Sequence, residues 1–84
     1  MHYQIDVESL TIESVHSIYH HIKPLLQSHA ELVISGQNIK KIDTSGIAML
    51  LTCWQHALEF KVNCHFDLSE SVVRAMHSYN LELP

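Results

Sequence analysis

The chain has 84 residues, of which 46% are hydrophobic, and it contains two glycines and two prolines. This composition predicts one compact domain over residues 1–84 and excludes a disordered linker, while a chain of this size has little room for a deep catalytic cavity. The formal net charge is −4, and the five Lys and Arg residues form no basic stripe, which argues against binding to nucleic acid or to an anionic membrane surface.

Cysteine usage and the N-terminal residues both bear on the cellular compartment. Cys53 and Cys64 lack the close spacing of a disulfide framework, so we expect two reduced, buried thiols. The N-terminal residues MHYQIDVES carry acids where a signal peptide would carry an apolar segment, and no apolar run approaches the roughly 18 residues of a spanning helix. We therefore expect a cytoplasmic protein without direct membrane insertion.

The first half of the chain predicts a strand, a helix and a second strand. Apolar and polar residues alternate over residues 3–8, which predicts a half-buried strand over residues 3–10. From about Thr11 the period changes to that of an amphipathic helix, and Pro24 is expected to kink this helix or to begin a second short turn. The apolar residues that define the helical stripe are Ile12, Val15, Ile18, Tyr19, Ile22, Leu25 and Leu26. The apolar run ELVIS, residues 31–35, predicts a central strand.

The second half repeats the alternation of helix and strand. A helix is expected from near Thr44 to about Phe60, followed by a strand over residues 62–68 and a last helix over residues 69–81. The resulting order β-α-β-α-β-α requires crossover connections, which produce parallel strands. We therefore expect a small α/β sandwich, a mostly parallel sheet covered by helices.

The helix that begins near Thr44 is apolar on more than one side. At about 100° per residue, one face is predicted to lie on the sheet and consists of Ile47, Leu50, Leu51, Trp54, Ala57 and Leu58. On the opposite side fall Met49, Cys53, His56 and Phe60, where a solvent-facing helix would carry charged residues. Such a stripe predicts a surface for a protein partner or for a second copy of the chain. Single exposed apolar residues are also normal, and Phe60 could fold back over the end of the sheet.

A short polar motif, Asp43-Thr44-Ser45-Gly46, stands between an apolar strand end and the start of this helix. Asp, Thr and Ser side chains accept hydrogen bonds from the unpaired N–H groups of a first helical turn, so a capping role is expected. The same hydroxyl groups could also form a regulated site.

Residues 32–51, LVISGQNIKKIDTSGIAMLL, resemble the signature of STAS domains, the bacterial anti-sigma-factor antagonists. The resemblance implies a non-enzymatic switch module in which a partner kinase phosphorylates a hydroxyl of the motif and thereby releases a binding partner. Ser45 matches the phosphoacceptor, with Thr44 as the neighbouring hydroxyl and second choice, Asp43 as the motif acid and Gly46 as the helix-opening glycine. The partner would be an anti-sigma factor or serine-kinase-like protein, or a histidine-kinase-like protein of a chemotaxis-type pathway.

A second resemblance within the family leads to a different partner. The segment NIKKIDTSGIAMLL and the ending SYNLELP also resemble the small STAS subunit that sits on the ATPase of phospholipid-trafficking ABC transporters. In that subtype the hydroxyl at the position of Thr44 is the important one. The chain also departs from the family pattern, because it has room for one strand before the first helix and ends soon after Leu81.

Catalytic and metal-binding interpretations receive little support from the residues. A serine nucleophile needs a base and an oxyanion donor set, and no Gly-x-Ser-x-Gly element is present. His16 and His20 are four residues apart on the first helix, but Glu13 is the one further ligand type on that flank. We therefore expect no enzymatic activity, no metal site and no cofactor.

Overall fold

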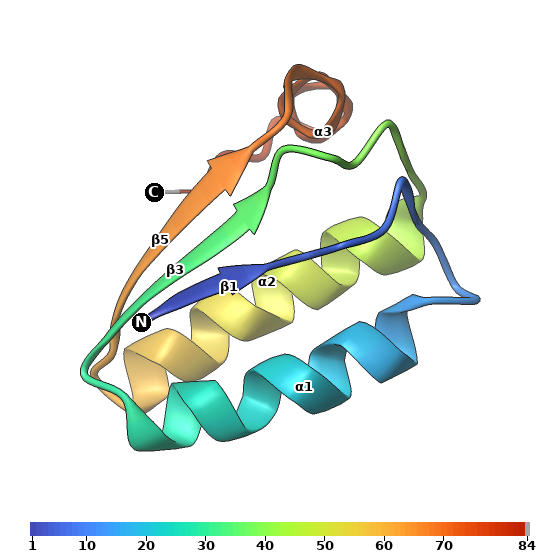
Figure 1. Ribbon diagram of the computed structural model, residues 1–84. Coiled ribbons are helices and arrows are strands. Elements are labelled where there is room, and N and C mark those ends of the chain that lie inside the picture. Colours follow the sequence, from blue (N-terminus) through green and yellow to red (C-terminus); the bar gives the residue numbers. More distant parts are fainter. Residues whose placement is uncertain (84) are drawn as a thin grey trace.

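Three parallel strands form the central sheet of the protein, which a computed structural model describes over residues 1–83 (Figure 1). The strands are β1 (His2–Gln4), β3 (Glu31–Gly36) and β5 (Asn63–Leu68), in the spatial order β1-β3-β5. Helices α1 (Val15–Ser28) and α2 (Thr44–Glu59) form the crossovers between them, and α3 (Glu70–His77) follows β5. The predicted α/β class and its order of main elements are confirmed.

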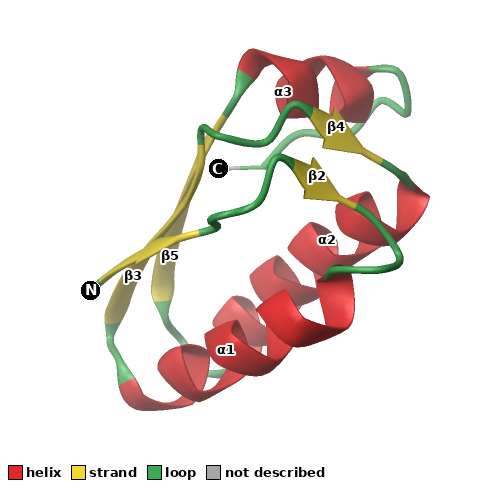
Figure 2. Cartoon of the chain, turned by 45° about the vertical axis from the view of Figure 1, so that its right-hand side comes forward, coloured by secondary structure: helices red, strands yellow, loops and turns green. Residues whose placement is uncertain are grey.

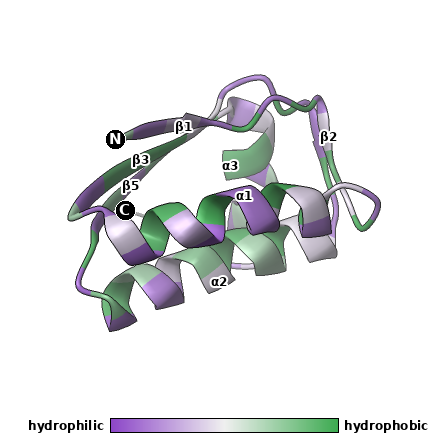
Figure 3. Cartoon of the chain, turned by 60° about the horizontal axis from the view of Figure 1, so that its bottom comes forward, coloured by the Kyte–Doolittle hydropathy of each residue, from purple (hydrophilic) through white to green (hydrophobic). Residues whose placement is uncertain are grey.

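Helices α1 and α2 lie side by side and together cover one face of the sheet, as Figures 1 and 3 show. Tyr3, Ile34 and Phe66 form one row across the three strands on this face. The buried apolar residues beneath the helices form one cluster, whose fully buried members include Ile5, Leu10, Ile22, Leu26, Leu32, Ile34, Ile39, Leu50 and Cys53. Helix α3 lies beyond the carboxyl end of β5 and packs against a separate short strand.

No helix covers the other face of the sheet within the described residues. Because successive side chains of a strand point to opposite faces, this face carries His2 from β1, Val33 from β3, and His65 and Asp67 from β5. His2, His65 and Asp67 are exposed, whereas Val33 is half-buried. The layer arrangement is therefore one-sided, with a polar open face.

The N-terminal strand expected over residues 3–10 is wrong in its length. The chain leaves the sheet after Ile5, whose N–H donates to the carbonyl of Ser35 (2.8 Å), and later forms β2 (Ser9–Leu10). Strand β2 pairs in parallel with β4 (Lys41–Ile42), as Figure 2 shows, and the Glu8 carbonyl accepts hydrogen bonds from the N–H groups of Lys40 and Lys41. This small ladder holds the start of α2 close to the segment before α1.

Two helix boundaries also differ from the expected ones. Helix α1 begins at Val15 rather than near Thr11, because Ser14 belongs to a preceding turn. Its hydroxyl donates a hydrogen bond to the Ser9 carbonyl (3.0 Å) and accepts one from the Thr11 N–H (3.1 Å). Pro24 lies inside this helix, which continues to Ser28. Helix α3 ends at His77, and Asn80 then adopts a left-handed conformation with φ of 58°.

No helix in residues 1–83 has the length and apolar composition needed to span a membrane.

Cys53 and Cys64 are free and buried, which confirms the expected state of both thiols. Burial, together with the neighbouring Cys64, raises the pKa of Cys53 to about 12, and burial raises the pKa of Cys64 to about 11. Because the thiolate is the reactive form, we expect iodoacetamide to label the native protein slowly at neutral pH and to label both cysteines rapidly in urea. Intact-mass measurements over time test this expectation, and rapid labelling of the folded protein would contradict it.

Candidate functional site

Asp43 caps α2 and at the same time ties this helix to the segment before α1. Its Oδ1 accepts the N–H of Gly46 (3.0 Å), and its Oδ2 accepts the N–H of Ile12 (3.1 Å). The hydrogen bond from Gly46, reinforced by that from Ile12, lowers the pKa of the Asp43 carboxyl group. The carboxylate is therefore ionised at neutral pH, and the predicted capping role and start of the helix are confirmed.

Gly46 lies where the first turn of α2 approaches the β2–β4 ladder most closely. The residue is buried, and a Cβ atom built on it would overlap the backbone carbonyl oxygen of Leu10 and lie 2.6 Å from Cγ1 of Ile42. A residue without a side chain is thus required by packing at this position. The glycine of the motif sets the distance between helix and ladder.

The two hydroxyl groups of the motif face different grooves on the surface of α2. Ser45 is half-buried and lines a groove between α1 and α2 together with Ile12, Val15 and His16. Thr44 is exposed and lines a second, apolar groove that includes Leu51, Tyr79 and Leu81. The two adjacent residues can therefore serve two different binding surfaces.

The stripe expected to face solvent on α2 is wrong for two of its four residues. Met49 is 6% exposed and Cys53 is fully buried. The reason is that α1 packs along this side of α2 (Figure 3), so this side of the helix is covered by another helix instead of by water. Met49 and Cys53 consequently belong to the core, although Met49 still borders the groove between α1 and α2 that Ser45 lines.

The remaining two residues of the stripe lie at the edge of the helix pair. His56 is half-buried, and its Nδ1 lies 2.7 Å from the hydroxyl oxygen of Tyr19 on α1, at hydrogen-bonding distance. Phe60 is 48% exposed and packs with its ring edge-on to the imidazole of His56, with ring centroids 6.2 Å apart. His56 thus connects the C-terminal half of α2 to α1, and Phe60 packs on His56.

The face of α2 predicted to lie on the sheet is partly exposed instead. Leu58 is 61% exposed, and Leu51 and Trp54 are half-buried, whereas Ile47, Leu50 and Ala57 are buried as expected. The centre of the buried face is rotated towards Met49 and Cys53, because α2 packs against α1 as well as against the sheet. The expected face corresponds to packing of α2 on the sheet alone.

Ile12 and Tyr19 lie near the site, although they are not among the site residues expected from the sequence. Ile12 is 68% exposed beside Ser45, and its N–H contacts Asp43. Their apolar spacing places both residues on the stripe expected to face the core, but Ile12 precedes the start of the helix at Val15.

Within the described part of the chain, the histidines of α1 do not form a metal site with other side chains. The rings of His16 and His20 stack with centroids 6.2 Å apart, and no cluster of three metal-ligating side chains occurs in residues 1–83.

Comparison of the chain with models of protein families, with curated proteins and with solved structures finds no match. The site combines three features: a cap that fixes the start of α2, a glycine at a close packing point, and two hydroxyl groups on two grooves.

Proposed function

We propose that the protein is a non-enzymatic bacterial signalling module that resembles anti-sigma-factor antagonists of the STAS family. In this proposal a partner kinase of the cytoplasm phosphorylates Ser45, and phosphorylation controls the binding of a protein partner. The partner would be an anti-sigma or serine-kinase-like protein, or a histidine-kinase-like protein of a chemotaxis-type pathway.

The observation that carries the proposal is the position of Ser45 beside an exposed apolar groove. Its side chain lies in the first turn of α2 and faces the groove that contains Ile12, which is 68% exposed. A partner that packs on Ile12 and Val15 would also cover Ser45. The hydroxyl is thus placed where a modification can act on an interface.

A phosphoryl group at Ser45 would be tolerated by the fold but not by a docked partner. It adds about −1.5 to −2 charges near neutral pH, and the N–H groups and dipole of a helix N-terminus favour an anion by roughly 0.3 to 1 kcal/mol. The ionised Asp43 opposes part of this gain, although solvent and salt screen the repulsion. A partner would have to remove water from the new charge, which costs several kcal/mol when the charge stays unpaired.

Ser45→Asp should therefore keep the fold and lose the partner, whereas Ser45→Ala should bind the partner and resist the kinase. Each tagged variant is incubated with an extract of the native bacterium, and captured proteins are identified by mass spectrometry. Thr44→Ala is the matched control. It removes the adjacent hydroxyl group, which lies on the other groove, and should therefore leave the binding of this partner unchanged. We expect at least a hundredfold weaker binding for Ser45→Asp. Equal capture by Ser45→Asp and the wild type would refute the switch.

A second function is favoured by the environment of Thr44. This exposed residue borders an apolar groove in which Tyr79 is 54% exposed, close to Leu51 and Leu81. Such a surface suits permanent docking, as expected of a STAS subunit bound to the ATPase of a phospholipid-trafficking ABC transporter. In that case the same capture experiment would yield a transporter ATPase, Thr44→Ala would weaken the complex, and Ser45→Asp would have little effect.

A further inference from the structure

Strand β5 forms an edge of the sheet, and its outward backbone groups can be identified from its pairing with β3. The Asn63 N–H donates to the Ala30 carbonyl (2.8 Å), so Asn63, and with it His65 and Asp67, direct their backbone groups towards β3. The alternate residues Cys64, Phe66 and Leu68 direct their N–H and C=O groups to the free edge. In residues 1–83 a single bond reaches these outward groups, from the Gln37 side chain to the Leu68 carbonyl (3.2 Å).

We propose that this edge binds a second copy of the chain, with the two β5 strands antiparallel about a two-fold axis at Phe66. In this register Phe66 forms a reciprocal pair of backbone hydrogen bonds with its symmetry mate, and Cys64 forms a pair with Leu68 on either side of the axis. The Leu68 carbonyl has a second lone pair for this bond beside the one used by Gln37. The two three-stranded sheets thereby become one continuous sheet.

The side chains select this register over its neighbour. Directly opposed residues of an antiparallel pair lie on the same face, so the axis at Phe66 places His65 of each copy opposite Asp67 of the other on the open polar face. An imidazole N–H donor then meets a carboxylate on both sides of the axis. An axis at His65 would instead oppose the two His65 rings and leave Asp67 opposite Asn63. Charge complementarity therefore favours the axis at Phe66.

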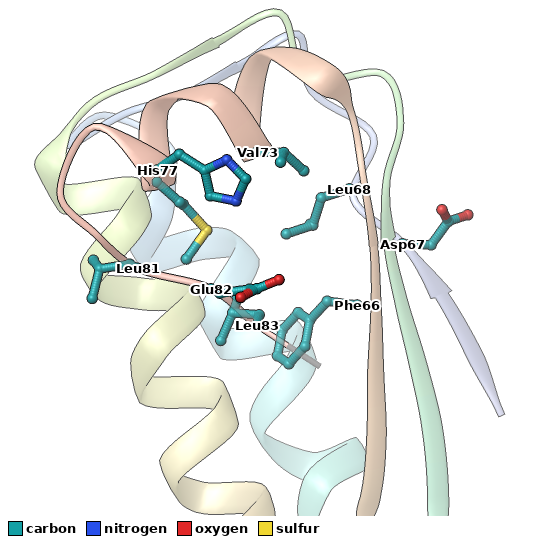
Figure 4. Close-up of a pocket in the computed structure, with 9 residues that line it drawn as sticks. Phe66, Asp67, Leu68, Val73, His77, Leu81, Glu82 and Leu83 are labelled. Carbon is teal, nitrogen blue, oxygen red and sulfur yellow. The ribbon is translucent and has the colours of Figure 1, made fainter.

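The apolar side of the edge also fits a second copy. Figure 4 shows that Phe66 and Leu68 point into a groove beside β5, whereas Asp67 points away from it. The groove has a volume of about 300 Å³, and its lining is mixed, with Val73 and Leu83 beside the polar side chains of His77 and Glu82. In the paired arrangement Phe66 of the second copy lies next to Phe66, so the two phenylalanine side chains meet across the axis. An uncovered edge strand with an apolar side is otherwise prone to unspecific pairing.

The dimer leaves the motif around Ser45 accessible. In Figure 1, β5 forms the left-hand edge of the sheet, whereas α2 begins on the right-hand side of the molecule. The dimer is thus independent of the proposed switch, and each can be tested without the other.

Two charge variants, alone and mixed, test the pairing through the mass measured by sedimentation equilibrium over a concentration series. His65→Glu places two carboxylates opposite each other twice, and Asp67→Lys places a lysine opposite each His65, so each variant alone should dimerise at least about tenfold more weakly than the wild type. In an equimolar mixture both opposed pairs are favourable again, because one is the native pair of imidazole donor and carboxylate and the other joins the introduced glutamate to the introduced lysine. The mixture should therefore regain the wild-type dimer.

The matched control is His2→Glu, the same change on the same open face but at the β1 edge. It should dimerise like the wild type, with twice the monomer mass of 9.6 kDa at high concentration. Both β5 residues are exposed, and circular dichroism verifies that each variant is folded. A wild type that stays monomeric at the highest concentration, an Asp67→Lys variant that dimerises normally, or a mixture that stays monomeric would each overturn the proposal.

Discussion

Gly46→Ala should destabilise the protein by about 2 to 4 kcal/mol, although alanine is the better helix former by about 1 kcal/mol. The added Cβ would overlap the backbone oxygen of Leu10, which cannot rotate away as a side-chain atom can, and it would lie 2.6 Å from Cγ1 of Ile42. The start of α2 would have to move from the β2–β4 ladder. Urea unfolding followed by circular dichroism measures the loss, which is a large part of the stability of a small domain.

Gly36→Ala is the matched control for this prediction. A Cβ at Gly36 would lie 2.9 Å from Cδ1 of Ile39 and 3.3 Å from Cδ2 of Leu68, which are the ends of flexible side chains. These can shift, so we expect a change of less than about 1 kcal/mol. Equal destabilisation by the two substitutions would show that the close approach of α2 to Leu10 is not what requires Gly46.

Met49→Glu should unfold the protein or destabilise it by about 3 to 5 kcal/mol, the cost of an uncompensated buried charge. Met49 is 6% exposed between α2 and its neighbours in the core. Leu58→Glu on the same helix is the control, because Leu58 is 61% exposed and a surface substitution changes stability by less than about 0.5 kcal/mol. The urea unfolding midpoints of both variants test whether Met49 faces the core and Leu58 faces solvent. A Met49→Glu variant as stable as the wild type would contradict this orientation of α2.

Much of the fold could be predicted from local patterns. The apolar run around Leu32 and the alternation of apolar and polar residues around Cys64 indicate the strands β3 and β5, and the helical period of the apolar residues indicates α1 and α2. Asp43 indicated the start of α2, because a capping side chain acts within one turn of its own residue. These features depend on neighbours in the sequence and are therefore visible in it.

The features that were not predicted depend on residues far apart in the chain. Strands β2 and β4 have two residues each, too few to show a period, and they exist because they pair with each other. The burial of Met49 and Cys53 results from the position of α1, which a helical projection of α2 alone does not contain. The groove beside Ser45 likewise depends on Ile12, which reaches the motif through its contact with Asp43.

The most direct test of the proposed function is the position of phosphate on the chain after incubation with ATP and an extract of the organism from which the protein comes. Tandem mass spectrometry of the tryptic peptide that follows Lys41 separates Thr44 from Ser45, and Ser45→Ala serves as the control. We predict phosphate on Ser45 in the wild type and none on this peptide in Ser45→Ala. Phosphate on another residue, or a peptide that stays unmodified, would contradict the switch and leave Asp43-Thr44-Ser45-Gly46 as a helix cap.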